Sequence, residues 1–540
     1  MSSASLELKW LSMARLYPYV VPVVLLGAIY LPHLSGDYFW DDLHLVRDHP
    51  LLHASNGWSR VFATELLEGA GKEKTQFYHP IPLLTLWLQF RVSDAFAWLR
   101  FGDVVIHAVA VLLFAEALRR FGSRRPTIAL AASAFAVHPL GVEPVLLVCG
   151  RHDTLGVAFL LGALVLGPLG RATSQRAALV RALGGSLLVM LAIWSKEACA
   201  GGVPMLALAA WLAPDAPRPW LARIARCMPP FAGLALALLV RRALAISGHS
   251  DQLFAPIVTN ARNYGTILFE YARYALLFRN GTVTRVFEPL PVAGALAVVA
   301  FASLLVGLAV RAVHRSGEVT TWTTERRVLL GLVWFCVSLG PHILSLPVIG
   351  MWGNRYGYWP TLGLLLVEAS LVEAILVDRD ARIRTGVVGA FGLIIALVTV
   401  ATTRIARTYH DGVTVFGADV QREPRNPLAH YHLGVEIERV AGCEPALPHF
   451  QTAVEIDPDY TRAMHNVAGC LVRLRRFDEA VEPAKKAVVG SGGSVGSIKN
   501  LVVAQWGSGH RAEARAILKR GRVMYPDSDV LRELDGELHR

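Results

Sequence analysis

The sequence predicts an all-α protein with two parts, a polytopic membrane domain of about eleven spans and a carboxy-terminal solenoid of helical repeats. Hydrophobic residues make up 54% and charged residues only 18% of the 540 residues, and the mean hydropathy is positive. A soluble core would not need so much apolar surface. Apolar runs long enough to cross a bilayer recur as far as residue 403. Beyond it, small residues recur with a fixed period.

Each apolar run is a candidate membrane span. The runs cover residues 16–34, 101–118, 127–147, 154–170, 179–195, 198–213, 227–246, 289–310, 328–348, 357–377 and 385–403. The first run follows Lys9 and Arg15 and has no clear small-residue cleavage site. We therefore interpret it as an uncleaved span and not as a signal peptide.

Arginine-rich connections predict the orientation of these spans. The basic connections are 119–125, 171–181, 218–226, 311–327 and 379–384. They are every second connection, and such clusters favour the cytoplasmic side, so the amino terminus is expected inside and the repeats outside. The stretch 262–279 must then cross an even number of times, and its charges at helical spacing indicate an amphipathic helix on the outer surface. The net charge of +11 is explained by this topology, because no basic cluster is interleaved with aromatic residues as nucleic-acid binding requires.

The tail has an internal repeat. Ala446, Ala480 and Ala514 are spaced 34 residues apart, and Ala453 and Ala487 share that spacing. A 34-residue helix–turn–helix unit with small packing residues is the tetratricopeptide pattern, and the alternative is an arbitrary bundle of helical hairpins. The six cysteines show neither a C-x-x-C pair nor metal-ligand spacing, so no disulfide framework is predicted.

These patterns predict the domain boundaries. The membrane domain is expected at 1–403 with a large outer loop at 35–100, a linker at 404–425, and about three repeats at 426–540.

Two adjacent acids follow the first span in the phrase GDYFWDDLHL. Asp41 and Asp42 repel each other, which favours protonation of one of them. Such a carboxyl group can act as a general base or bind a metal ion. The alternative is a helix cap beside a solvated acid in an interfacial aromatic belt.

Further polar residues gather at the outer ends of the predicted spans. These candidate donor-phosphate or substrate-binding residues are His79, His138, Glu143, Arg151, Asp153, Lys196, Glu197, Arg355 and Tyr358. Ionisable groups near a membrane are costly unless they pair or line a cavity, so their convergence on one side favours a site. Arginine and lysine there could hold a phosphate. The structural alternatives are helix-locking ion pairs (Glu143–Arg151 or Lys196–Glu197), a backbone contact for His138, and an interfacial anchor for Tyr358.

Six short phrases, in order and followed by the repeats, resemble a known family. They are FWDD (39–42), YHP (78–80), HPLGVEP (138–144), GRHD (150–153), SKE (195–197) and RYGYWP (355–360). Over almost its whole length the chain resembles the transmembrane and tetratricopeptide-repeat O-mannosyltransferases and their bacterial relatives, in the glycosyltransferase C superfamily. It departs where His79 replaces the family's common arginine and Asn354 replaces its glutamate.

The resemblance implies a membrane enzyme that moves a sugar from a polyprenyl-phosphate carrier to a hydroxyl, usually of a protein, outside the cytoplasm. It implies that Asp41 or Asp42 takes the acceptor proton, and it suggests that Arg151, Lys196 or Arg355 steadies the lipid phosphate. The lipid-linked sugar is the donor substrate, no cofactor is certain, and a divalent metal is left open. The expected partners are membrane lipid and an acceptor protein held by the repeats, with no nucleic acid. The expected location is a bacterial inner membrane with periplasmic repeats.

Two other classes of function remain open at this point. One is a non-catalytic membrane scaffold whose repeats assemble envelope complexes, in which case Asp41 and Asp42 would be dispensable. The other is a lipid-linked transporter, although transporters more often show polar or broken segments at the bilayer midplane. No G-x-x-x-x-G-K, H-E-x-x-H or G-x-S-x-G motif occurs. This argues against an ATP-driven pump, a zinc protease of that type and a serine hydrolase.

Overall fold

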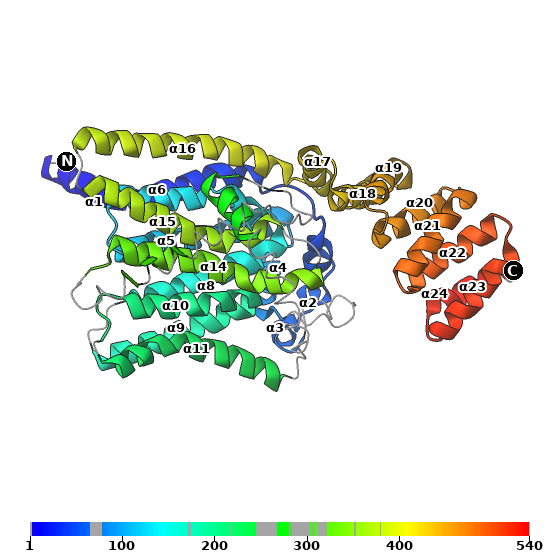
Figure 1. Cartoon of the computed structure of the whole chain (residues 1–540), viewed down its shortest axis with the longest axis horizontal. Helices are drawn as coiled ribbons and strands as arrows, with labels where there is room; N and C mark the ends of the chain where they lie inside the picture. The colour runs from blue at the N-terminus through cyan, green and yellow to red at the C-terminus, as the bar shows by residue number, and fades with distance from the viewer. Residues whose placement is uncertain are drawn as a thin grey trace. The chain divides into compact units, whose positions relative to one another are not determined.

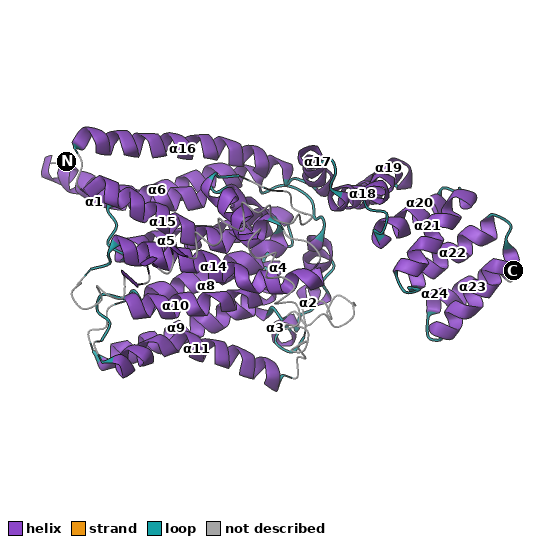
Figure 2. Ribbon diagram, viewed as in Figure 1, coloured by secondary structure: helices purple, strands orange, loops and turns teal. Residues whose placement is uncertain are grey.

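The structure is a computed structural model in which the chain is helical. It describes residues 3–64, 78–170, 174–217, 219–244, 267–279, 281, 303–304, 307–308, 310–311, 321–349, 353–377 and 380–538. Within these ranges every regular element is a helix and no strand occurs (Figure 1; Figure 2). The predicted all-α class is confirmed for this part of the chain. The predicted span 289–310 lies largely outside the described residues.

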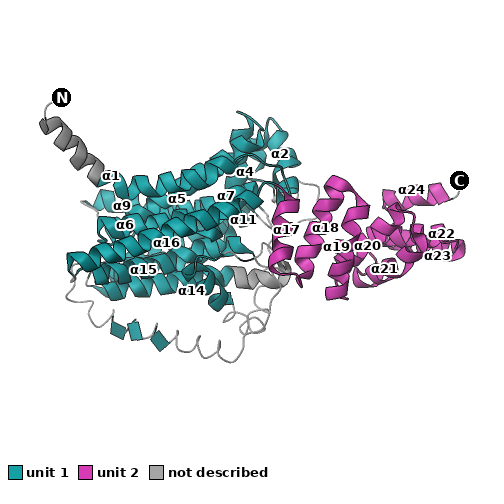
Figure 3. Cartoon of the chain, turned by 90° about the horizontal axis from the view of Figure 1, so that it is seen from above, with its two compact units in different colours: residues 1–281, 287–410 teal, residues 282–286, 411–540 magenta. Residues whose placement is uncertain are grey.

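The chain forms two compact units, which follow one another in the sequence at residues 410 and 411 (Figure 3). Unit 1 holds the long apolar helices and unit 2 holds the helical tail. The predicted linker 404–425 is mostly helical, because α16 (Ala381–Thr408) and α17 (Gly412–Arg422) occupy most of it.

Seven helical segments in the described part of unit 1 are long and apolar enough to cross a membrane. They belong to α1 (Ser3–Tyr30), α5 (Phe96–Arg120), α8 (Arg151–Leu166) with the turn η5 (Val148–Gly150), α9 (Gln175–Ser195), α11 (Trp220–Ala243), α15 (Tyr358–Val377) with the turn η7 (Asn354–Gly357), and α16. An eighth span would combine α6 (Arg125–Ala136) with the segment Pro139–Leu146, at a bend of 49°. These helices indicate a multi-pass membrane protein, whereas the count of eleven stays a prediction.

Further helices and turns belong to unit 1. They are α2 (Pro50–His53), α3 (Gly57–Arg60), α4 (Pro80–Phe90), α7 (Val142–Leu146), α10 (Gly202–Leu212) and α14 (Thr324–Ile349), with the turns η1 (Leu31–His33), η2 (Leu43–Arg47), η4 (Pro139–Gly141) and η6 (Glu197–Gly201). Of these α14 is long, and it coincides with the predicted span 328–348. The predicted span 198–213 corresponds to the shorter apolar segment Glu197–Leu212.

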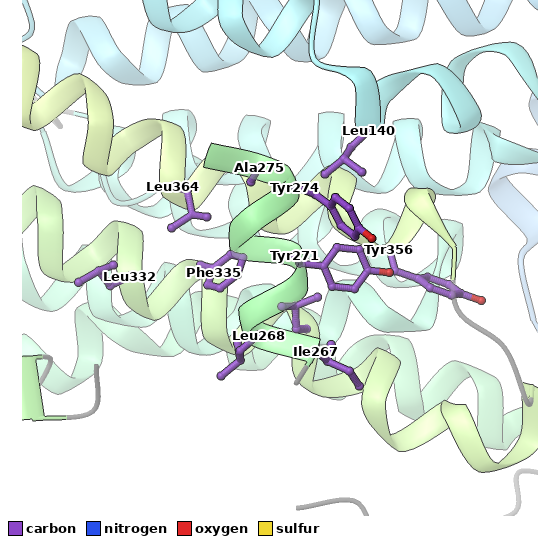
Figure 4. Packing of buried hydrophobic residues seen from close by; sticks show 11 residues of the cluster. Leu140, Ile267, Leu268, Tyr271, Tyr274, Ala275, Leu332, Phe335, Tyr356 and Leu364 are labelled. Carbon is purple, nitrogen blue, oxygen red and sulfur yellow. The ribbon is translucent and has the colours of Figure 1, made fainter. Parts of the chain in front are cut away.

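The stretch predicted as an amphipathic helix contains a helix over residues 267–276. Figure 4 shows its buried face, in which Tyr271 and Tyr274 lie among residues of neighbouring elements such as Leu140, Phe335 and Tyr356. The Tyr271 hydroxyl donates to the Gly353 carbonyl at 2.6 Å. This helix therefore packs against the bundle beside the turn η7.

One end of the bundle brings distant parts of the chain together. The buried Arg100 guanidinium, near the start of α5, donates to the carbonyls of His33, Ser35 and Tyr409, at 3.1, 3.0 and 2.6 Å. The Asp37 amide also donates to the His410 carbonyl at 2.9 Å. The first outer loop and the end of α16 therefore meet at the same end of unit 1.

Unit 2 consists of helices with a regular spacing. They are α17, α18 (Pro427–Ala441), α19 (Cys443–Ile456), α20 (Thr461–Arg473), α21 (Phe477–Gly490), α22 (Val495–Gly507), α23 (Arg511–Met524) and α24 (Asp529–Leu538). Alternate helices from α18 onward begin 34 residues apart, which is the period of the sequence repeat, and Ala446, Ala480 and Ala514 are fully buried. The tetratricopeptide class itself stays a prediction.

Candidate active site

Asp42 is a buried anchor of the first outer loop. Its carboxylate accepts hydrogen bonds from the amides of Val148 and Cys149 at 3.0 and 2.7 Å. Burial raises the pKa of Asp42 to about 6, although these two amides oppose the shift. The group is fully buried, so it fixes the turn η5 against the loop and presents no oxygen to a substrate.

Asp41 has the opposite surroundings. Its side chain is 37% exposed, and one carboxylate oxygen lies 3.5 Å from Nη1 of Arg355. The preceding residue, Trp40, has a φ of 52°, which is costly for a bulky side chain. The Arg355 guanidinium lies over the Trp40 ring, 5.1 Å from its centre. The strained turn thus sends two neighbouring acids in different directions.

Arg355 connects Asp41 to a second acid. Its backbone amide donates to Glu143 at 3.2 Å, and its Nε lies 3.7 Å from the other Glu143 oxygen. Glu143 is almost fully buried, whereas the Arg355 side chain keeps 18% of its surface exposed. A cation held between two acids, with one open side, can bind a further anion without moving.

Lys196 lies beside this group. Its ammonium forms an ion pair with Asp153 and lies 5.2 Å from the centre of the Tyr356 ring. The Arg355 guanidinium lies 5.5 Å from the same ring. Two cations, one from η7 and one from the end of α9, therefore lie near the same Tyr356 ring.

His79 and Glu197 form a further pair, which lies at the start of α4 and in η6. His79 Nε2 contacts one Glu197 oxygen, and the Tyr78 amide donates to the other at 2.9 Å. Burial disfavours the Glu197 carboxylate, but His79 and the Tyr78 amide outweigh burial and hold the pKa of Glu197 below its usual range. Arg241 lies 3.8 Å from the same carboxylate.

Sequence reasoning missed His152, which connects these groups. Its Nδ1 must carry the proton, because it contacts the Cys149 carbonyl oxygen, which can only accept. Its Nε2 is then a buried acceptor without a hydrogen-bond partner among the described residues. The ring lies 4.7 Å from the His79 ring. The only sequence signal for His152 is its place in the GRHD phrase, between the candidate residues Arg151 and Asp153.

Three predicted site residues lie elsewhere in the core. Arg151 is buried in an ion pair with Asp103 at 2.6 Å, and its Nη2 donates to the Leu99 carbonyl at 2.8 Å. His138 contacts the Ala275 carbonyl and the Leu140 amide, at 3.1 Å each. The Tyr358 hydroxyl lies 2.7 Å from His107 Nδ1, where both side chains are buried. These contacts hold helices together.

The structure therefore brings most of the predicted residues into one network. The connected residues are Asp41, His79, Glu143, Asp153, Lys196, Glu197 and Arg355, and Asp42 supports them through η5. Among the described residues, a group with metal-binding spacing occurs only at Glu438, Cys443 and Cys470 in unit 2, where the two cysteines form a disulfide.

Comparisons with known proteins agree with the sequence phrases. No family model matches the chain. A protein O-mannosyl-transferase of Caenorhabditis elegans is 21% identical over 456 residues, which are 80% of this chain and 61% of that protein. The protein O-mannosyl-transferase TMTC3 of Mus musculus is 29% identical over 144 residues, which are 26% of this chain and 16% of that protein. TMTC2 of the same organism is 27% identical over 143 residues, 26% of this chain and 17% of that protein.

The chain thus spans 61% of the length of the first of these relatives and a smaller share of the other two. The predicted resemblance is confirmed, because the chain's curated homologues are named protein O-mannosyl-transferases, at modest identity over much of its length.

Proposed function

We propose that this chain is a membrane glycosyltransferase that moves a sugar from a polyprenyl-phosphate donor to a protein hydroxyl on the non-cytoplasmic side. The names of its homologues and its apolar helices support a membrane-bound transferase. The observation that best supports the site is the half-exposed Asp41 beside the cation Arg355, at 3.5 Å. An accessible base next to a fixed cation is what this transfer needs.

In the proposed step the acceptor hydroxyl oxygen attacks the anomeric carbon of the sugar. The new carbon–oxygen bond forms as the bond from that carbon to the phosphate oxygen breaks, and polyprenyl phosphate leaves with the electron pair. The hydroxyl proton passes to Asp41. A single displacement of this kind inverts the configuration at the anomeric carbon.

Arg355 and Lys196 are the proposed phosphate-binding residues. Each is mostly buried, each keeps 17–18% of its side chain exposed, and each is already oriented by an acid. Fixed cations lose little freedom when a phosphate arrives, and they stabilise the charge that develops on the leaving group. The free Nε2 of His152 could accept a hydrogen bond from a substrate hydroxyl.

The position of Arg355 also bears on whether transfer needs a divalent metal. Arg355 lies between Asp41 and Glu143, where it already supplies positive charge to both carboxylates. We therefore propose that transfer proceeds without a divalent metal. A chelator should leave the rate unchanged, and a rate that falls with the chelator and returns with Mg²⁺ or Mn²⁺ would contradict this.

Unit 2 is proposed to hold the acceptor. Stacked helical repeats form concave surfaces that suit an extended peptide. The helices recur at the 34-residue spacing that such a stack needs.

The test compares the wild type with Asp41→Asn, Asp42→Asn and Asp48→Asn, each purified as the full chain. The substrates are a panel of polyprenyl-phosphate sugars with membrane proteins as acceptors, and the readout is labelled sugar on protein. Asp41→Asn should lower transfer by roughly 10²–10⁴-fold, as loss of a general base does, without a change in thermal melting. Asp48 is the matched control, because it is an exposed acid of the same loop that pairs with Arg47.

Two results would overturn the proposal. Transfer by the folded Asp41→Asn variant at the wild-type rate would remove Asp41 from the chemistry. No transfer by the wild type with any donor, together with capture of envelope proteins that requires unit 2, would favour the scaffold.

A further inference from the structure

A cavity lies at the opposite end of the bundle from Asp41. It has a volume of about 410 Å³ and lies between α8, α9, α10 and α11. Its lining includes Gly167 after α8, Leu179 and Gly185 of α9, Ala210 of α10 and Arg226 of α11. The site residues lie at the other ends of these helices, and the 16 residues of α8 separate the two ends by roughly 24 Å. That distance approaches the thickness of a bilayer's hydrocarbon layer, about 30 Å.

The surroundings of this cavity are apolar and face outward. Leu179 is 59% exposed and lines the cavity, and Leu183 and Leu221 on the outward sides of α9 and α11 are 62% and 63% exposed. Figure 1 shows α9 and α11 along one edge of unit 1. Exposed leucines in such long apolar helices belong against lipid tails, so the cavity lies beside surfaces of α9 and α11 that suit lipid.

Two arginines give the cavity a basic end. Arg181 donates to the carbonyls of Leu166 and Gly167 at 2.9 and 2.8 Å, and it thereby caps α8. Its remaining nitrogen, Nη1, is buried and has no hydrogen-bond partner among the described residues. Arg226 pairs with Asp215 at 2.8 Å. Two cations and one acid leave an excess positive charge and one unused donor.

We infer that this cavity binds the head group of an anionic phospholipid. The excess positive charge of Arg181 and Arg226 would attract a phosphate, and the apolar walls would hold the first part of an acyl chain. The basic connections 171–181 and 218–226 place this end on the predicted cytoplasmic side, where anionic lipids are enriched. The open apolar walls favour a phospholipid over free phosphate, and the site is separate from the proposed transfer chemistry.

The test measures lipid binding and not activity. The full chain is placed in nanodiscs of phosphatidylcholine with increasing phosphatidylglycerol, and native mass spectrometry counts the retained lipids. Arg181→Gln should reduce retention of phosphatidylglycerol roughly fivefold, the effect of one basic residue near an anionic surface. The matched control is Arg176→Gln, which removes the same charge one to two turns earlier on α9 from an exposed residue that does not line the cavity.

A second variant guards against a folding defect at Arg181. Gly185→Leu fills the cavity without changing charge, and a Cβ at Gly185 would meet its nearest neighbour only at 4.0 Å. It should also release phosphatidylglycerol, while its melting temperature stays near that of the wild type. Retention by both variants, or equal loss from Arg176→Gln, would overturn the site. Displacement of phosphatidylglycerol by millimolar inorganic phosphate would show a site for free anions only.

Discussion

At the scale of single residues, adjacent positions in the sequence have unrelated roles. Asp42 is buried and accepts two backbone hydrogen bonds, whereas Asp41 is exposed beside Arg355. The positive φ of Trp40 produces this division. The sequence alone left open which acid is the base, because repulsion between neighbours does not reveal which one the fold buries.

The buried carboxyl of Asp42 predicts a particular dependence of stability on pH. Burial raises its pKa from 3.8 to about 6, so between these values the folded state binds more protons than the unfolded state. The free energy of unfolding should therefore decrease as pH rises from about 4 to about 6, by roughly 3 kcal/mol from this group. Thermal unfolding of unit 1 in detergent, measured across that range, checks the sign.

Asp42→Asn should flatten this part of the curve, because the side chain no longer titrates. Asp48→Asn should not flatten it, because Arg47 holds the pKa of Asp48 below its usual range. Parallel curves for the wild type and Asp42→Asn would mean that Asp42 does not titrate in this range.

At position 355, lysine should not replace arginine without loss, although both side chains carry one positive charge. Arg355→Lys keeps the charge but loses the planar fork that lies over Trp40 and reaches both Asp41 and Glu143. Under the proposed function the KM for the lipid-linked donor should rise roughly tenfold, since about 1.4 kcal/mol of binding corresponds to that factor. Initial rates against donor concentration measure it.

Arg47→Lys is the control, because Arg47 is exposed in the same loop and pairs only with Asp48 among the ion pairs described. An unchanged KM in Arg355→Lys would show that Arg355 only orders the loop.

Most of the site's composition was predictable from the sequence, but its pairings were not. The GRHD and SKE phrases predicted the cations, yet Arg151 pairs with Asp103 and Lys196 with Asp153. Asp103 lies inside an apolar helix and belongs to no motif. Partners this far apart in sequence are chosen by helix packing, which no local pattern contains.

At the scale of elements, small residues decide how closely helices approach. The backbones of α14 and α15 meet at Gly331 and Gly363, where a Cβ on Gly363 would lie 2.5 Å from the Gly331 carbonyl oxygen and 2.7 Å from the Phe335 amide nitrogen. Such contacts are typical of membrane helices, which associate through small residues. The sequence showed the apolar runs, but it did not show which glycine faces a neighbour.

Gly363→Val should force these two helices apart. Both nearest neighbours are backbone atoms that cannot move away as a side chain can, so the free energy of unfolding should fall by roughly 1–3 kcal/mol. Thermal melting in detergent measures the loss. Gly389→Val on α16 is the matched control, since nothing lies within 4 Å of its Cβ position, and equal melting of the two variants would disprove the close contact.

The bend between α6 and the segment Pro139–Leu146 is also explained by local sequence. Pro139 follows the end of α6 and begins the turn η4, and the chain bends by 49° between α6 and the segment Pro139–Leu146. A proline removes an amide donor and clashes with the preceding turn. The sequence predicted a span at 127–147, and the bend within this stretch accompanies the contact of Glu143 with Arg355.

At the scale of the whole molecule, the end of α16 fixes where the chain leaves unit 1. The Tyr409 and His410 carbonyls accept from Arg100 and from the Asp37 amide, beside the first outer loop. The chain therefore leaves unit 1 at the end that holds Asp41. The basic connections predict that this end of unit 1 lies on the outer side.

A disulfide in unit 2 bears on which side of the membrane the repeats occupy. Cys443 at the start of α19 is bonded to Cys470 in α20, although spacing alone predicted no such pair. Disulfides persist mainly in oxidising compartments outside the cytoplasm. The remaining cysteines Cys149, Cys199 and Cys227 are buried, and Cys336 is half-buried, so the wild-type chain offers little to a membrane-impermeant thiol reagent.

Because the wild-type cysteines offer little to such a reagent, an introduced cysteine reports directly on which side of the membrane it lies. Val489 of unit 2 is 82% exposed, and Gln175 is exposed at the start of α9, the end of the bundle opposite the site. In intact cells an impermeant maleimide should label Val489→Cys and leave Gln175→Cys unlabelled, and permeabilised cells should label both. In the wild type, label should enter at Cys443 only after a reductant is added, because Cys443 is half-buried and Cys470 is fully buried. Labelling of Gln175→Cys alone in intact cells would reverse the predicted topology and remove Asp41 and the repeats from the outer side. Labelling of both variants in intact cells would place the two positions on the same side and contradict the predicted number of crossings between them.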